Sequence, residues 1–270
     1  MRRNIYDSEL DNWHRRVTRQ SEDAIFEAAQ LYHTPLDMLY VQPYTTLDDL
    51  KKYKALIMPH ASIMTKERAD LLEEYVRQGG VLIIGCRSGY KDANGRCVMI
   101  PQPGLLQKLT ATDVAEYTLA SPAEEEPWAD WNGQRMPMPV FNDVLTPLEG
   151  ADVLARFGCS YYAGEAALTE RRLGKGRAVH LGGAFSREAA MLILAHVGLL
   201  EPFAEKVSAP QEVELAMREK DGQQYLFALN YQPKPMEIVL HREVFSLFEE
   251  KAVSGSVTLA PYGVEVYRIG

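Results

Sequence analysis

Cys86 follows the apolar run VLII at 81–84 after a single glycine, in the sequence VLIIGCRSG. A thiol on a sharp turn after a buried strand is well placed to act as a nucleophile, if a histidine takes its proton and a carboxylate orients that histidine. His180 stands in GRAVHLGG, at the end of another apolar stretch. Cys86 and His180 are therefore the candidates for nucleophilic catalysis.

The class I glutamine amidotransferases place a cysteine in such a turn and a His-x-Glu sequence at a later strand end. In this chain Leu181 and Gly182 follow His180, so the glutamate is missing. Cys86 is followed by Arg87-Ser88-Gly89 instead of one residue and then glycine. Two interpretations remain: a catalytic thiol served by His180, or a small cysteine buried at a strand end, which the departures favour.

Polar residues continue after Cys86 in the sequence RSGYKD. They could line a polar pocket at the strand ends, where a ligand or a neighbouring subunit would bind. The alternative is a local ion pair between Arg87 and Asp92, with a tight turn at Gly89. The ligand or interface candidates in this stretch are Arg87, Ser88, Gly89, Lys91 and Asp92.

Two further candidates, Trp128 and Trp131, stand in the acidic segment SPAEEEPWADWNG at 121–133. The face of an indole ring can stack on the apolar face of a sugar. The alternative, which we favour, is that both rings pack this segment onto its own or a neighbouring subunit. The two prolines and the charge of the segment predict a loop.

The elements that position these residues follow from the hydrophobic periodicity. The predicted elements are a helix over 17–33, strands at 36–41, 54–59 and 81–84, and a helix between the last two that begins at Thr65 and ends at Gly79-Gly80. Short apolar strands that alternate with amphipathic helices predict parallel strands covered on both faces. We therefore expect an α/β first domain over 1–205, a flavodoxin-like (class I glutamine amidotransferase-like) doubly wound sheet with its chemistry at the strand ends.

Later segments predict a hairpin, a helix and a second domain. The hairpin turns at Gly174-Lys175-Gly176, and the helix covers 186–200. From 206 to 270 short alternating stretches are separated by Asp221-Gly222 and other turn residues. This pattern predicts a small, antiparallel, all-β domain that is β-sandwich-like.

Composition limits the partners. The net charge of −8 and the absence of basic clusters argue against nucleic acid and an acidic membrane surface. The cysteines Cys86, Cys97 and Cys159 form no CxxC or Cys/His cluster, so the sequence indicates no metal, no cofactor and no disulfide framework. No signal peptide or membrane span is apparent, and we expect a cytoplasmic protein.

No pair of carboxylates stands in the sequence context that a glycosidase requires. A retaining glycosidase needs two carboxylates about 5–5.5 Å apart across the glycosidic bond. The chain has 37 Asp and Glu residues but no Asn-Glu dipeptide. A (β/α)₈ barrel takes about 250 residues, and the few predicted βα units leave no room for one.

Four segments together resemble the non-catalytic half of the glycoside hydrolase family 42 β-galactosidases. They are DNWHRR, the block from YKALIMPH to KDANGR, LGKGRAVHLGG, and the C-terminal YLFALNY with GSVTLAPYGVEVYRIG. That half comprises a flavodoxin-like trimerisation domain and a C-terminal β domain. The similarity covers residues from about 5 to 270.

The resemblance implies a non-catalytic assembly module that self-associates as a trimer. In that family the catalytic glutamates lie on an N-terminal barrel, which implies a barrel that is either lost here or carried by a separate chain. Arg87, Ser88, Gly89 and Asp92 match the family's strand-end motif, for which a structural or interfacial role is implied. Two rival functions stay open: a cysteine hydrolase or amidotransferase that uses Cys86 and His180, and a sugar-binding accessory protein.

Overall fold

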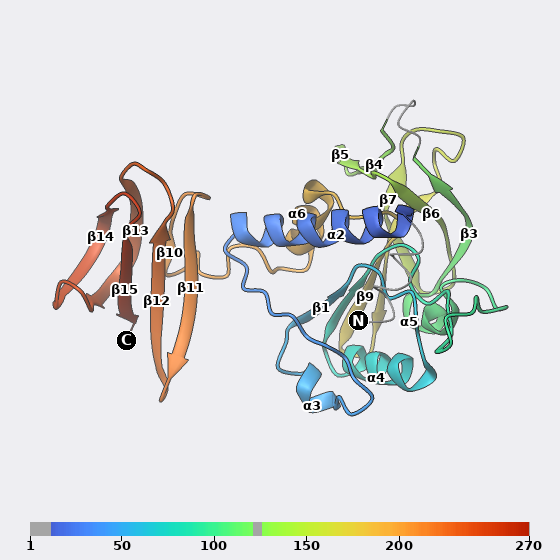
Figure 1. Cartoon of the computed structure of the whole chain (residues 1–270), viewed down its shortest axis with the longest axis horizontal. Coiled ribbons are helices and arrows are strands. Elements are labelled where there is room, and N and C mark those ends of the chain that lie inside the picture. The colour runs from blue at the N-terminus through green and yellow to red at the C-terminus, as the bar shows by residue number, and fades with distance from the viewer. Residues whose placement is uncertain (1–11, 121–125, 270) are drawn as a thin grey trace. The chain divides into compact units, whose positions relative to one another are not determined.

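Figure 1 shows the computed structural model of the chain, which describes residues 12–120 and 126–269, with only the backbone for 12–16. The chain divides into two compact units. The first comprises Met1–Ile25 and Met38–Ala190, and the second comprises Phe26–Asp37 and Met191–Gly270. Each unit contains one β-sheet.

The helices are short except for the first. They are α2 (Asn12–Leu31), α3 (Leu47–Leu50), α4 (Lys66–Arg77), the 3₁₀ helix η1 (Gly104–Leu106), α5 (Gln107–Thr110) and α6 (Arg187–His196). Helix α4 begins where the sequence predicts, because Thr65 Oγ1 caps it by accepting a hydrogen bond from the Arg68 N–H at 3.4 Å. It buries Leu72, Tyr75 and Val76, and it ends before Gly79.

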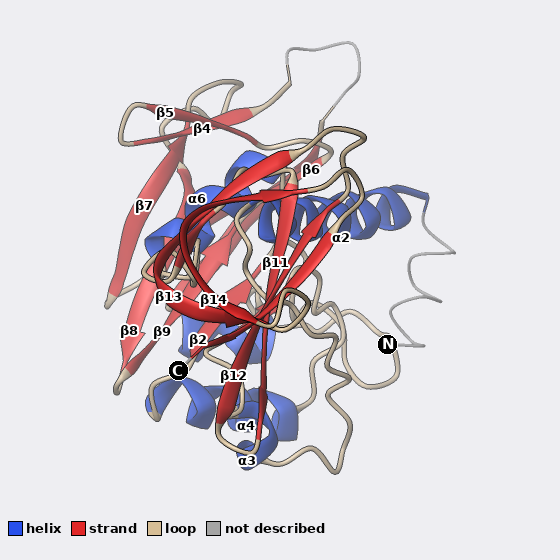
Figure 2. Ribbon diagram, turned by 90° about the vertical axis from the view of Figure 1, so that its left-hand side faces the viewer, coloured by secondary structure: helices blue, strands red, loops and turns tan. Residues whose placement is uncertain are grey.

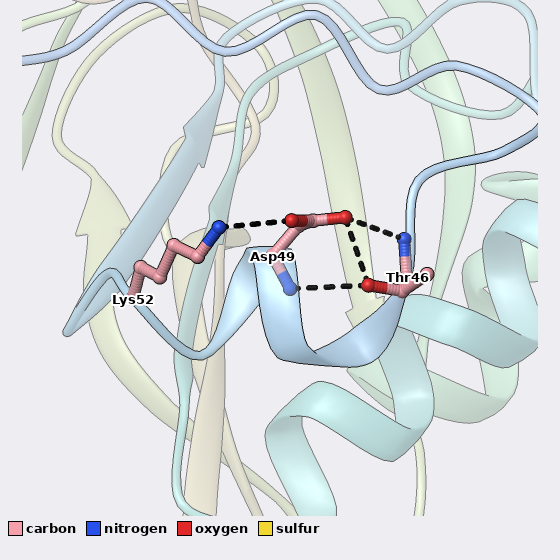
Figure 3. A network of polar contacts seen from close by, with 3 residues as sticks. All are labelled: Thr46, Asp49 and Lys52. Atoms are coloured by element: carbon pink, nitrogen blue, oxygen red, sulfur yellow. Dashed lines mark hydrogen bonds and ion pairs between the residues drawn. The ribbon is translucent and has the colours of Figure 1, made fainter.

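Helix α3 is closed by a capping box. Thr46 Oγ1 accepts a hydrogen bond from the Asp49 N–H at 3.3 Å, and Asp49 Oδ2 accepts one from the Thr46 N–H at 3.1 Å (Figure 3). Lys52 Nζ donates to Asp49 Oδ1 at 3.0 Å. These bonds hold the pKa of the Asp49 carboxyl at about 2, the hydrogen bond from Lys52 having the largest effect.

The first unit contains a nine-stranded sheet. Its strands are β1 (Ala55–Met58), β2 (Val81–Ile84), β3 (Thr112–Leu119), β4 (Trp128–Trp131), β5 (Gln134–Pro137), β6 (Phe141–Pro147), β7 (Ala151–Phe157), β8 (Ala166–Leu173) and β9 (Gly176–Leu181). The order is β1-β2-β9-β8-β7-β4-β5, and β6 pairs with both β3 and β8. Among its described strand pairs, only β1–β2 and β2–β9 are parallel. Every other described pair of this sheet is antiparallel.

The predicted flavodoxin-like, doubly wound sheet is therefore wrong. A parallel pair needs a crossover helix, and only residues 55–84 supply a complete strand–helix–strand unit. Residues 36–41, predicted as a strand, join no sheet. Residues 112–157, where the helical rhythm is lost, form the five strands β3 to β7, which pair antiparallel with their neighbours. The result is a mixed and mostly antiparallel sheet in a mainly β protein.

The segment 121–133, predicted as a loop, is also partly a strand. Residues 121–125 lie outside the described residues, but Trp128–Trp131 form β4, which pairs with β5. The turn between them is Asn132-Gly133, with φ of 53° and 82°. Two consecutive residues with positive φ are typical of the tight turn that matches the twist of a hairpin, and Asn-Gly is its preferred sequence.

The predicted hairpin at Gly174-Lys175 is confirmed, because β8 and β9 pair antiparallel on either side of it. Its turn lies against the end of α4. The Lys175 N–H donates to the Arg77 carbonyl at 2.9 Å, and the Arg177 N–H donates to the Gly80 carbonyl at 3.2 Å. The hairpin and the glycine stop of α4 therefore hold each other in place.

Apolar residues cover both faces of the first sheet. On one face Leu56, Leu72, Leu82 and Ile84 belong to a single core cluster that includes residues of α4 and α5. Figures 1 and 2 show α2 on the opposite side of the sheet from α4. On that side Val17 of α2 packs in a smaller cluster with residues of the strand ends.

The second unit contains a six-stranded sheet, all of whose described pairs are antiparallel. Its strands are β10 (Val207–Ser208), β11 (Val213–Lys220), β12 (Gln223–Asn230), β13 (Met236–Ser246), β14 (Lys251–Leu259) and β15 (Val264–Ile269). Leu226, Ile238 and Tyr267 lie in its core. The side-chain amide of Asn230 donates to the Lys234 and Ala260 carbonyls, both at 2.8 Å, and so fixes the loops at one end of the sheet.

Candidate functional site

The turn that follows β2 carries the sequence-predicted residues. At its centre Arg87 has a φ of 57°, a left-handed conformation that costs a residue with a side chain about 1–2 kcal/mol. The Arg87 N–H donates to Asp143 Oδ2 at 2.6 Å. The Asp143 N–H in turn donates to the Gly182 carbonyl at 2.6 Å. The ends of β2, β6 and β9 are therefore joined through one buried aspartate.

Asp143 is 5% exposed, and burial raises the pKa of its carboxyl to about 7, although the Arg87 N–H and the Arg87 charge partly oppose this shift. The carboxyl therefore titrates near neutral pH. This residue is not among the candidates predicted from the sequence. Its signal in the sequence is one acidic residue inside the run FNDVL, whose five positions are all buried.

The Arg87 side chain lies among aromatic rings. Its guanidinium carbon is 4.3 Å from the ring centroid of Tyr90, 5.0 Å from that of Phe141 and 5.9 Å from that of Tyr117. The side chain is half-buried, and its Nε atom has no hydrogen-bond partner among the described residues. Phe141 and Tyr117 stack on one another with centroids 5.7 Å apart.

Ser88 and Gly89 hold the turn in place. Ser88 Oγ is buried, donates to the Gly85 carbonyl at 2.7 Å and accepts from the Ala61 N–H at 3.3 Å. Gly89 has a φ of 72°, and a Cβ atom there would lie 2.0 Å from the Pro103 carbonyl oxygen. Both residues therefore stabilise the backbone of the turn, Ser88 by its hydrogen bonds and Gly89 by leaving room for the Pro103 carbonyl.

Lys91 and Asp92 organise the next turn. The Lys91 N–H donates to the Ser62 carbonyl at 2.9 Å, and the Lys91 carbonyl accepts from the Met64 N–H at 3.1 Å. Asp92 Oδ1 accepts from the N–H groups of Asn94 and Arg96, and the bond from Arg96 lowers the pKa of this carboxyl most. The local Arg87–Asp92 ion pair considered from the sequence is not present among the described residues.

Cys86 is fully buried against Val17, Phe141 and Ala184. Burial raises the pKa of its thiol well above the ordinary value, and the nearby Asp143 carboxyl raises it further. The thiolate, and not the thiol, is the nucleophile. At neutral pH Cys86 is therefore a protonated thiol of low reactivity.

His180 faces a different set of neighbours. Its Nδ1 atom is 2.8 Å from Thr112 Oγ1, and its Nε2 atom has no hydrogen-bond partner among the described residues. Burial lowers the pKa of the ring to about 3, so the imidazole is neutral. No described hydrogen bond joins this ring to Cys86, so the arrangement lacks the base contact that activates a nucleophile.

The position where an amidotransferase would carry its glutamate is sterically closed. A Cβ atom on Gly182 would lie 2.3 Å from the Asp143 carbonyl oxygen and 3.2 Å from Leu145 Cγ. No side chain fits there without movement of the backbone, and the glycine permits the hydrogen bond between β6 and β9 noted above.

The two tryptophans pack within their own unit. Trp131 is 8% exposed. Trp128 is half-buried, with the Arg135 guanidinium 4.7 Å from its ring centroid, and a Cβ atom on Gly158 would lie 2.1 Å from the ring. A sugar could stack on this ring face only by displacing Arg135.

Residues 12–120 and 126–269 contain neither a cluster of metal ligands nor a helix suited to crossing a membrane. Nowhere in this part of the chain do three or more His, Cys, Asp or Glu side chains gather as ligands for a metal ion. None of its helices has the length and apolar character that a membrane crossing requires.

Both units of the chain match known protein families. Residues 5–199 match the family model of the β-galactosidase trimerisation domain, and residues 212–268 match that of the β-galactosidase C-terminal domain. The chain belongs to the glycoside hydrolase family 42 β-galactosidases. The resemblance predicted from the four sequence segments is confirmed, and what the chain contains is the non-catalytic trimerisation and C-terminal domains of that family.

Individual proteins similar to this chain are also β-galactosidases. The chain is 27% identical over 237 residues to the β-galactosidase BglY of Alicyclobacillus acidocaldarius and 28% identical over 225 residues to BgaA of Clostridium cellulovorans. It covers 34% and 33% of those proteins, while 83% and 82% of this chain is matched. The chain thus spans about a third of the length of the curated relatives it matches. A crystal structure of the β-galactosidase from Bacillus circulans sp. alkalophilus superimposes with a TM-score of 0.82 at 24% identity, over 92% of this chain and 37% of that one.

Proposed function

We propose that this chain is the assembly module of a β-galactosidase-like glycoside hydrolase. The first domain, 1–205, associates with two other copies to form a trimer, and the second domain, 206–270, completes the module. The observation that carries the proposal is the match of residues 5–199 to the β-galactosidase trimerisation domain.

The chemistry belongs to a catalytic barrel, on a further part of the same protein or on a separate chain, that acts on β-galactosides. The proposal is supported by the length of the match, because this chain spans only about a third of the β-galactosidases to which it is similar. It is also supported by the site itself, where the strand ends hold a protonated thiol and a neutral histidine that no described hydrogen bond joins. The module works in the cytoplasm, and its three cysteines are free thiols, as a reducing compartment would keep them.

Assembly is tested by sedimentation equilibrium and multi-angle light scattering over a range of concentrations. The expected mass is three times the 30.4 kDa of the chain. A strict monomer at tens of micromolar would contradict the proposal.

Catalysis is tested with a nitrophenyl β-galactoside. The chain alone is expected to give no turnover, and activity is expected when it is co-purified with a barrel-bearing chain encoded beside it. Turnover by the purified chain alone, which disappears in a Cys86→Ala variant, would favour the rival thiol hydrolase.

A further inference from the structure

The Arg87 guanidinium is partly removed from water, and although Tyr90 hydrogen-bonds to it, no carboxylate of the described residues forms an ion pair with it. It is half-buried among three aromatic rings, and no ion pair joins it to an acidic residue in the described part of the chain. Its Nε atom is buried and makes no hydrogen bond. Buried charges in proteins are normally paired, because the loss of hydration is otherwise uncompensated.

The nearby carboxyl group of Asp143 fills this role only in part, because its charge acts on the guanidinium without an ion-pair contact. Its Oδ2 atom accepts the backbone N–H of Arg87 at 2.6 Å, and it makes no ion pair with the guanidinium. The bond instead fixes the backbone of Arg87, and the rings of Tyr90 and Phe141 fix the direction of the side chain. The guanidinium is therefore preorganised, which lowers the entropy that a binding partner must overcome.

We propose that Arg87, together with Tyr90 and Tyr117, receives a carboxylate from a second copy of this chain and forms part of the interface between copies. This inference rests on the proposed function, because it assigns the contact to the assembly of the trimerisation domain. Arginine presents two parallel N–H groups to a carboxylate, so the pairing is directional as well as charged.

The exposure of Tyr117 and the charge composition of the chain support a second copy as the binding partner. Tyr117 is 66% exposed beside the guanidinium, on the strand position directly opposite Asp143. Arginine and tyrosine are enriched among the residues that dominate binding energy at protein interfaces. The chain carries 37 acidic against 29 basic residues, so another copy offers carboxylates in excess. The whole turn lies within the residues that match the trimerisation domain.

The experiment compares the self-association of four forms of the full chain by sedimentation equilibrium: wild type, Arg87→Met, Tyr117→Ala and Arg242→Met. Arg87→Met keeps the length of the side chain and removes the charge. Arg242 lies on an exposed position of β13 and serves as the matched control. Circular dichroism and thermal unfolding establish that each variant is folded. If Arg87→Met is unstable, Tyr117→Ala still tests the contact, because it alters a mostly exposed side chain.

The dissociation constant is expected to rise about tenfold or more in Arg87→Met and in Tyr117→Ala, and to stay unchanged in Arg242→Met. A wild-type monomer would contradict both this inference and the proposed function. A wild-type oligomer that associates equally well in both site variants would contradict this inference alone.

Cross-linking identifies the partner group. In an Arg87→Lys variant, a carbodiimide is expected to join the new amine to a carboxylate by an amide bond with loss of water. Mixing unlabelled and ¹⁵N-labelled chains distinguishes the two origins by mass spectrometry. A hybrid peptide supports a contact between copies, whereas a link found only within one chain would overturn it.

Discussion

The carboxyl group of Asp143 accepts a hydrogen bond from the backbone of Arg87, a residue 56 positions earlier in the chain, at 2.6 Å. This bond connects β6 to the turn that follows β2 and holds a left-handed arginine in place. Because the carboxyl is buried, its ionisation is coupled to the stability of the turn.

The stability of the protein is expected to depend on the protonation of Asp143. Its pKa is 3.8 for an unperturbed carboxyl and about 7 in the folded chain, so the folded state binds the proton more tightly. The stability that this group contributes is fully present below pH 3.8 and is lost as the pH rises through 7. Asp143→Asn keeps an acceptor for the Arg87 N–H and does not titrate. Between about pH 5 and about pH 7, the free energy of unfolding of the wild type should fall relative to the variant by up to about 1.4 kcal/mol per pH unit.

Urea denaturation of both proteins at several pH values measures this difference. Groups other than Asp143 act equally in both proteins and cancel in the comparison. Parallel pH dependences would show that the Asp143 carboxyl ionises as it does in the unfolded chain.

The three cysteines are expected to differ in reactivity. Cys97 is exposed, whereas Cys86 is fully buried with a raised pKa. With iodoacetamide near neutral pH, Cys97 should be alkylated first, and Cys86 should react only when the protein unfolds. Peptide mass mapping over time measures this order. Rapid labelling of Cys86 in the folded chain would favour the hypothesis of a cysteine hydrolase.

Gly182→Ala is expected to destabilise the protein by about 3 kcal/mol, since overpacking against the backbone forces it to move. The introduced Cβ atom would meet the Asp143 carbonyl oxygen at 2.3 Å. Gly95→Ala is the control, because it enters open space and meets only the strain of a φ of 79°, about 1 kcal/mol. Chemical denaturation ranks the two variants, and equal losses would mean that β6 and β9 can separate without strain.

Trp128 is expected to be a packing residue. Its ring contacts Gly158 and Arg135, so calorimetry with galactose or a β-galactoside should give no heat from this ring at millimolar sugar. Trp131→Ala should destabilise more than Trp128→Ala, because Trp131 is almost fully buried. Binding heat that disappears in Trp128→Ala would favour the sugar-binding accessory protein.

The sequence predicted an element well where the residues that begin, pack and end it all lie within one short segment. The capping threonine, the buried face and the glycine stop of α4 lie within one short stretch, as does the hairpin at Gly174-Lys175. The family was also recognisable, because its motifs lie along the sequence. By contrast, 36–41 has the composition of a strand and yet joins no sheet, because a strand needs a hydrogen-bonding partner from elsewhere in the chain.

The sequence by itself determined where helix α4 and the hairpin at Gly174-Lys175 lie, and to which family the chain belongs. Only the tertiary structure decided that most strands pair antiparallel, that Asp143 meets Arg87, and that Cys86 and His180 have separate neighbours. The reason is physical. Periodicity and capping depend on residues a few positions apart, whereas strand direction and the pKa of a buried group depend on contacts between distant segments, which form only when the chain packs.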